Sequence, residues 1–229
     1  MKKIKLFLYI SLALNIGFAI FLAGKWIRSR TAERVIFKKA DNWDAFAKAR
    51  ADVYKSLPAR RGNIAFVGTS LTEGFPLTEL FPDYIIDNRG IGGNETSHML
   101  SRISDVAKTH PLKLFLEAGI NDVKNGLSVD SIMRNYKHIV GIMKKQSPET
   151  QIYLQSIMPT SHSYLSLNNT VRECNAQIEE FSRENKYVYI HLYEYFSTDN
   201  ILTDSLTYDG LHLNAKGYKL WSELIAKEL

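Results

Sequence analysis

The sequence contains a single cysteine, Cys174, among 229 residues. One thiol excludes a disulfide within the chain and a zinc site built from several cysteines. We expect this thiol to be partly buried in a helix. Internal repeats and low-complexity tracts are also absent from the sequence. With 45% hydrophobic and 23% charged residues, the composition is instead typical of a globular protein with an ordinary hydrophobic core.

Acidic residues are fewer than basic ones, and the formal net charge is +5. Much of this excess lies in the first forty residues rather than along a surface that could follow a nucleic acid. No nucleic-acid-binding motif accompanies it, so we expect no nucleic-acid partner. The basic residues in this stretch are Lys2, Lys3, Lys5, Lys25, Arg28, Arg30, Arg34, Lys38 and Lys39.

One long apolar run is present, residues 6–24, which reads LFLYISLALNIGFAIFLAG. A helix of this length just spans a hydrocarbon core of about 30 Å. Lysines precede the run, and Lys25-Trp26-Ile27-Arg28 follows it as an interfacial group of aromatic and basic side chains. We therefore predict an N-terminal hydrophobic helix that anchors the chain to a membrane within residues 1–27, followed by a basic linker over 28–40.

Other interpretations of this segment stay open. A cleaved signal peptide requires small residues at its cleavage site, and Phe21-Leu22-Ala23-Gly24 matches poorly. A lipoprotein signal requires a cysteine where Lys25 stands, and a buried core helix is the third alternative. Because positive charge flanks both ends, the charge bias defines orientation weakly. The hypothesis is a membrane-anchored domain exported to a periplasmic or extracellular location, and the alternative is secretion after cleavage.

Residues 41–229 are expected to form one domain in which short apolar runs alternate with helical patterns. A helix is predicted from about Asn42 to Leu57, where Pro58 ends it. Helical spacing recurs from Ile132 to Met143, and a last helix begins after Asn214, a plausible N-cap. The brief runs, rich in β-branched or aromatic residues and bounded by turn residues, are typical of buried parallel strands. They cover residues 64–67, 84–86, 112–116, 152–154 and 187–190.

This alternation predicts right-handed crossovers and an α/β fold, a three-layer α/β/α sandwich around a parallel, flavodoxin-like, five-stranded sheet. Ligands bind such folds at the carboxyl ends of the strands. Polar, glycine-bearing blocks follow the first three expected strands, and a fourth lies before the last helix. The blocks are Gly68-Thr69-Ser70-Leu71, residues 88–94 (NRGIGGN), Gly119-Ile120-Asn121-Asp122 and Asp209-Gly210-Leu211-His212.

These blocks contain the residue types that ester cleavage requires. The Ser70 hydroxyl is a weak nucleophile until a base such as His212 takes its proton. Asp209, three residues before His212, can orient and stabilise the imidazole. The backbone N–H of Gly93 and the side-chain amide of Asn121 are candidate donors to the oxyanion that forms at the carbonyl.

In this order, the four blocks resemble those of the SGNH, or GDSL-like, hydrolases, from about Asn63 to the C-terminus. The resemblance implies a catalytic triad of Ser70, Asp209 and His212. It also implies an oxyanion hole made by the backbone N–H of Ser70 together with Gly93 and Asn121. Neither a metal nor an organic cofactor is implied.

The chain departs from the family pattern at one position, because Thr69 replaces the aspartate of Gly-Asp-Ser. All proton-transfer roles remain filled, so the replacement puts only local hydrogen bonding in question. The chain also lacks Gly-x-Ser-x-Gly, which argues against an α/β-hydrolase. Each block alone could be an ordinary turn or helix cap. His162 follows the fourth expected strand and could line the pocket, whereas His98, His110, His138 and His191 are expected to be structural or exposed.

The expected function is that of a serine esterase that removes a small acyl group, in particular acetyl, from a carbohydrate. No long apolar loop separates the blocks to enclose a fatty chain. The alternatives are an acyltransferase using the same site, a lysophospholipase or thioesterase, and a catalytically silent carbohydrate-binding relative.

Overall fold

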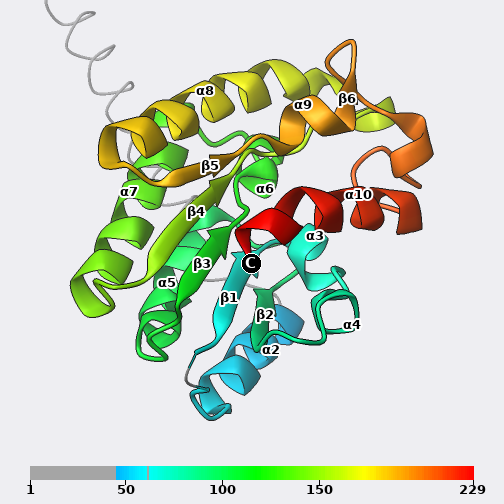
Figure 1. Cartoon of the computed structure of the whole chain (residues 1–229). Helices are drawn as coiled ribbons and strands as arrows, with labels where there is room; N and C mark the ends of the chain where they lie inside the picture. The colour runs from blue at the N-terminus through cyan, green and yellow to red at the C-terminus, as the bar shows by residue number, and fades with distance from the viewer. Residues whose placement is uncertain (1–44, 61) are drawn as a thin grey trace, which may run out of the picture. The chain divides into compact units, whose positions relative to one another are not determined.

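The computed structural model describes residues 45–60 and 62–229 of the chain (Figure 1). The predicted anchor (1–27, with its apolar run 6–24), the linker (28–40) and the start of the domain at residue 41 lie outside the described residues and stay predictions. None of the helices that the structure describes is long and apolar enough to cross a membrane. The first of them, α2, runs over Ala45–Ser56 and ends close to where Pro58 predicted.

Five parallel strands form the sheet at the centre of the domain, in the order β2-β1-β3-β4-β5. This order and the layers of helices on both faces confirm the predicted flavodoxin-like sandwich. At the carboxyl end, Gly68 of β1 pairs in register with Gly90 of β2. The strands are β1 Ile64–Gly68, β2 Ile86–Gly90, β3 Lys113–Leu116, β4 Gln151–Gln155 and β5 Val188–Ile190.

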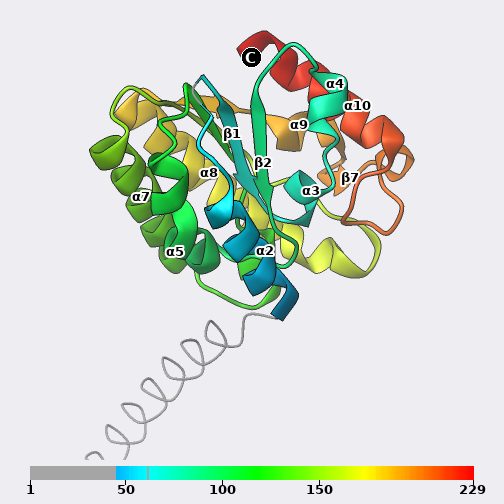
Figure 2. The same ribbon diagram turned by 90° about the horizontal axis from the view of Figure 1, so that it is seen from below.

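Alternate side chains of the inner strands point to opposite faces of the sheet, and each face has its own helices (Figures 1 and 2). Ala65 and Val67 of β1 belong to the core beneath α5 Thr96–Ala107, α7 Val129–Gln146 and α8 Asn168–Asn185. Ile64 and Phe66 face the other core, which α10 Ala215–Ile225 covers together with shorter elements. On this face the shorter elements include α3 Ser70–Glu73, α4 Leu77–Leu80 and α9 Leu192–Phe196, whereas α6 Ile120–Lys124 and the 3-10 turn His162–Leu167 pack against the first core. The remaining short elements are a hairpin of β6 Ser197–Thr198 and β7 Ile201–Leu202, and the 3-10 turns Asp204–Leu206 and Ala226–Glu228.

Helix α10 is held against the sheet at several points, and the segment just before it carries His212. The Trp221 ring is fully buried and stacks on Phe75 with 4.4 Å between centroids. The indole N–H of Trp221 donates to Oε1 of Gln155 at 2.8 Å. The Asn214 side chain accepts hydrogen bonds from the N–H groups of Lys216 and Gly217, which confirms the predicted N-cap. The start of α10 is therefore firmly positioned.

The second strand begins two residues later than the sequence predicted and includes Asp87–Gly90, which we had expected to follow it. Tyr84 and Ile85 are instead 42% and 46% exposed. The apolar pattern misplaced the start of the strand, because polar side chains of this strand are buried and have hydrogen-bond or ion-pair partners. Asp87 accepts a hydrogen bond from Asn63 and forms ion pairs with two arginines. At Gly90, a Cβ atom would lie 2.2 Å from the backbone nitrogen of Glu73, so only glycine fits.

Candidate active site

The structure brings Ser70, His212 and Asp209 together at the carboxyl end of the sheet. Ser70 is the first residue of α3, directly after β1, and His212 lies 142 residues away in the segment that leads into α10. The Ser70 Oγ atom is 3.0 Å from Nε2 of His212, and Nδ1 of His212 is 2.7 Å from Oδ2 of Asp209. The hydroxyl, imidazole and carboxylate thus form one continuous hydrogen-bonded chain.

The turn from Asp209 to His212 holds the carboxylate against the imidazole. Oδ1 of Asp209 accepts hydrogen bonds from the N–H groups of Leu211 and His212, at 2.9 and 2.7 Å. The turn requires Gly210, which has a φ of +86° and where a Cβ atom would meet the carbonyl oxygen of Ser161 at 2.7 Å. Backbone geometry therefore fixes the position of the carboxylate.

The electrostatics of Asp209 favour its ionised form. Burial alone would raise the pKa of this carboxyl, but hydrogen bonds from the His212 side chain and from two backbone N–H groups lower its pKa below the ordinary value. An ionised Asp209 holds a proton on Nδ1 of His212, which leaves Nε2 free to accept the proton of Ser70.

Asn94, which follows Gly93 in the chain, connects Gly93 to Asn121. The Asn121 amide donates one hydrogen bond to the carbonyl oxygen of Asn94, at 3.0 Å, and retains a second N–H. Gly93 has a φ of +75°, in the left-handed region that favours glycine. The glycine loop lies close to the serine, because a Cβ atom on Gly92 would be 3.6 Å from the Ser70 Cβ.

Sequence patterns did not identify Glu117, which directly follows β3 and lies beneath Ser70. Its side chain is fully buried. Its Oε2 accepts hydrogen bonds from the N–H and hydroxyl of Thr69, at 3.2 and 2.9 Å, and from the hydroxyl of Thr72 at 3.1 Å. Burial raises the pKa of Glu117. Thr69 is thus the partner of a buried acid, which explains the hydrogen bonding at the position where the family has aspartate. A glutamate at the end of a buried apolar strand was the available signal.

Asp122 fastens the third block to the start of α5. Its carboxylate is fully buried and accepts from the N–H of Thr96, at 3.0 and 3.1 Å, and from the Thr96 hydroxyl at 2.5 Å. Desolvation by burial raises the pKa of Asp122 to about 7, although the Thr96 hydrogen bonds oppose the shift. The loop that contains Gly93 and the loop that contains Asn121 are therefore tied together.

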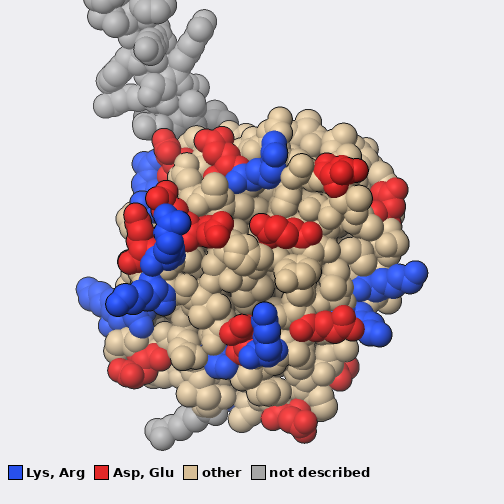
Figure 3. Space-filling model, turned by 45° about the horizontal axis from the view of Figure 1, so that its top comes forward, with Lys and Arg blue, Asp and Glu red and all other residues tan. Residues whose placement is uncertain are grey.

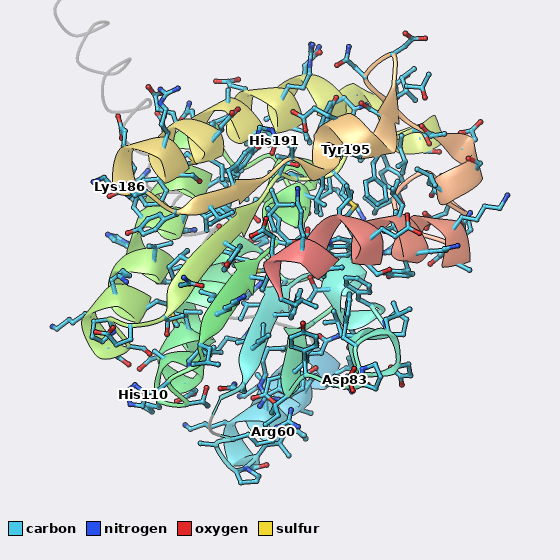
Figure 4. The ribbon with its side chains drawn as sticks, viewed as in Figure 1. Arg60, Asp83, His110, Lys186, His191 and Tyr195 are labelled. Atoms are coloured by element: carbon cyan, nitrogen blue, oxygen red, sulfur yellow. The ribbon has the colours of Figure 1, made fainter. Side chains whose placement is uncertain are left out.

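The other histidines lie apart from this chain of hydrogen bonds. His162 is exposed and its ring lies 3.1 Å from Asp204, although its Cβ borders the turn at Gly210. His110 and His191 are exposed, at the end of α5 and the start of α9 (Figure 4). Cys174 is buried in α8, and burial raises the pKa of its thiol to about 12. Among the residues that the structure describes, no group of three His, Cys, Asp or Glu side chains is arranged to hold a metal ion.

Similarity to known proteins extends over the part of the chain that forms this site. The GDSL-like Lipase/Acylhydrolase family matches residues 59–220. The platelet-activating factor acetylhydrolase IB subunit alpha1 of Rattus norvegicus is 23% identical over 165 residues, which are 68% of this chain and 69% of that protein. An N-acylneuraminate cytidylyltransferase of Streptococcus agalactiae is 24% identical over 133 residues, 58% of this chain, and the match spans only 32% of that longer protein.

Solved structures show the same fold. A GDSL-like lipase from Bacteroides thetaiotaomicron superposes with a TM-score of 0.72 over 80% of this chain and 96% of that one, at 23% identity. At this identity the likeness concerns the fold alone.

We predict that Asp122→Asn changes the pH dependence of stability. The pKa of Asp122 is raised from its ordinary value of 3.8 to about 7 in the folded protein. The protonated carboxyl therefore makes its full contribution to the free energy of unfolding below pH 3.8, and this contribution is lost as the pH rises through 7. Between about pH 5.5 and about pH 7.5, the wild-type free energy of unfolding should fall by about 2 kcal/mol relative to the variant. Urea denaturation at both pH values measures this. Parallel behaviour of the two proteins would contradict the raised pKa.

Proposed function

The chain belongs to the GDSL-like lipase/acylhydrolase family, and on this premise we propose that it is a serine esterase whose catalytic triad is Ser70, His212 and Asp209. Membership of the family implies hydrolysis of ester bonds. One observation carries the assignment of the triad: the hydrogen-bonded chain from Ser70 Oγ through His212 to the Asp209 carboxylate, with contacts of 3.0 and 2.7 Å. A nucleophile, a base and an orienting carboxylate are thereby in reach of one another.

The first step is acylation of Ser70. Its Oγ attacks the ester carbonyl while Nε2 of His212 takes the hydroxyl proton. Asp209 stabilises the imidazolium that results. When the tetrahedral intermediate collapses, the bond from the carbonyl carbon to the alkoxy oxygen breaks and His212 protonates the departing alcohol. The acyl group then remains on Ser70.

Deacylation repeats these transfers with water. His212 takes a proton from water as it attacks the acyl carbon, and returns that proton to Ser70 as the carboxylic acid leaves. In both steps the negative charge on the carbonyl oxygen is stabilised by the backbone N–H groups of Ser70 and Gly93 and the side-chain amide of Asn121.

The proposed substrate is a small acyl ester, acetyl above all, on a carbohydrate. The site is open to solvent, since the His212 and Asp209 side chains are 30% and 34% exposed. The blocks are not separated by a long apolar insertion. A relative named as an acetylhydrolase is consistent with a short acyl group.

A membrane location is proposed on sequence alone. Residues 6–24 would anchor the enzyme, and the basic residues around them would lie at the membrane surface. The catalytic domain would then work on the exported side, periplasmic or extracellular, where esters on surface carbohydrates are within reach.

Replacing Ser70 by alanine should abolish turnover of p-nitrophenyl acetate by the full-length chain. Without the nucleophile, kcat should fall at least about a thousandfold. The matched control is Ser166→Ala, which removes an exposed hydroxyl outside the site and should leave kcat unchanged. Equal activity in the two variants would disprove the triad.

Asn121→Ala should lower kcat about a hundredfold to a thousandfold with little change in KM, because the lost donor acts mainly on the transition state. The control is Asn125→Ala, at the end of the same short helix, whose amide donates to Glu95 at 2.7 Å. This control removes a structural hydrogen bond of similar kind and should retain most activity. If both variants lose activity equally, the Asn121 effect is structural and the oxyanion role is wrong.

The acyl preference can be measured with p-nitrophenyl acetate, butyrate and octanoate. We expect kcat/KM to be highest for acetate and at least about tenfold lower for octanoate, because a bound chain of eight carbons needs apolar surface to cover it. Release of acetate from an acetylated sugar tests the carbohydrate half of the proposal. A preference for octanoate would instead indicate a lysophospholipase or thioesterase.

A further inference from the structure

A cavity away from the proposed triad is lined by residues of α2, the edge strand β2 and α5, and none of the triad residues lines it. Figure 2 shows how these three elements are arranged. The volume of the cavity is about 250 Å³. Among the residues that the structure describes, four basic side chains and one acidic side chain line it. The basic residues are Lys55 from α2, Arg89 from β2, Arg102 from α5 and Lys108 from the end of α5.

The two arginines of this cavity are buried, each only 8% exposed. The guanidinium of Arg102 donates to neutral acceptors, the side-chain oxygen of Asn94 at 3.3 Å and the carbonyl oxygen of Gly68 at 3.5 Å. No carboxylate of the described residues lies within ion-pairing distance of it. Desolvation by burial, together with the nearby charge of Arg89, lowers the pKa of Arg102 to about 10, while Tyr54 has the opposite effect.

Arg89 has a partial counter-charge. Its Nη2 lies 3.2 Å from Asp87, but the same carboxylate also pairs with Arg60 and accepts from Asn63. The guanidinium is positioned over the ring of Tyr54, 5.0 Å from the ring centroid. Among the described residues, Asp87 is the one carboxylate within ion-pairing distance of Arg89, and it is shared with Arg60.

The acidic side chain of the cavity, Asp105, pairs with one of the four basic residues, because its Oδ1 lies 2.7 Å from Nζ of Lys108. The other three basic residues remain without this counter-charge. Positive charge therefore exceeds negative charge around the cavity. This differs from the surface in Figure 3, where basic and acidic side chains are interspersed. Buried cations without sufficient counter-charge are unfavourable, so the cavity has the electrostatic character of an anion site.

We propose that this cavity binds a phosphate group between Arg89 and Arg102, with Lys55 and Lys108 at its edge. Guanidinium groups present paired N–H donors that match the oxygens of phosphate. Several cations around one small cavity favour a dianion over a monovalent carboxylate. The phosphate can be inorganic, or the head group of a phosphate ester or lipid. This site is separate from the proposed esterase site.

Thermal unfolding of the full-length chain in sodium phosphate, compared with unfolding in sodium chloride at equal ionic strength, tests the proposal. Phosphate should raise the Tm saturably, and by more than chloride does. Arg89→Gln should weaken the apparent phosphate affinity at least about tenfold, because it removes a charge-assisted contact. The control is Lys219→Gln, which neutralises an exposed lysine on α10 and should leave the affinity unchanged.

A second variant covers the case in which Arg89→Gln does not fold. Ala51→Leu enlarges a side chain that lines the cavity, leaves the charge unchanged and keeps a residue with high helix preference. It should abolish the saturable rise in Tm. Equal phosphate affinity in Ala51→Leu, Lys219→Gln and wild type, or an equal shift in chloride, would overturn the proposal.

The source of the phosphate is distinguished with soluble esters. Tighter binding of inorganic phosphate and glycerol phosphate than of glycerophosphoglycerol would indicate a free phosphate or monoester. Equal or tighter binding of the diester would indicate a lipid head group. Ser70→Ala should bind phosphate like wild type, so failure of this proposal and failure of the esterase proposal are distinguishable.

Discussion

The contact between Ser70 and His212 is the constraint on which the remainder of the site depends, because it joins residues that are 142 positions apart. Each partner is held by a different part of the fold. Ser70 starts a short helix at the end of the central strand β1, and His212 is positioned by a glycine turn and by the docking of α10. Trp221 fixes that helix through stacking and a buried hydrogen bond. The geometry of the proposed triad is a consequence of tertiary packing at the carboxyl end of the sheet.

Buried acids support the site from behind. Glu117 accepts hydrogen bonds from Thr69 and Thr72 next to Ser70, and Asp122 accepts hydrogen bonds from Thr96, which follows the Gly93 loop. Burial raises the pKa of both carboxyls, so each group opposes folding when it ionises. Hydrogen bonds within the protein offset part of the hydration free energy that these carboxyls lose on burial. The same hydrogen bonds leave the groups that they join few alternative positions. This rigidity holds Ser70 and the candidate oxyanion donors in place before a substrate binds.

The two proposed sites share a structural link although their residues differ. Arg102 of the basic cavity donates to Asn94 and to the carbonyl oxygen of Gly68. The carbonyl oxygen of Asn94 in turn accepts from the amide of Asn121, and Gly68 lies two residues before Ser70. A buried arginine thus contacts residues that adjoin the candidate oxyanion donors in the sequence.

The sequence by itself determined the alternation of strands and helices, the order of the four polar blocks and the cap at Asn214, because these depend on local periodicity and short-range hydrogen bonds. Only the tertiary structure decided where β2 begins, since its buried polar residues are satisfied by partners such as Asn63, 24 residues away from Asp87. The partnership of Glu117 with Thr69 and the placement of Arg89 and Arg102 around one cavity were also decided there. Burial and charge compensation depend on residues that are far apart in the sequence and meet only in the folded protein. A local sequence pattern therefore cannot predict them.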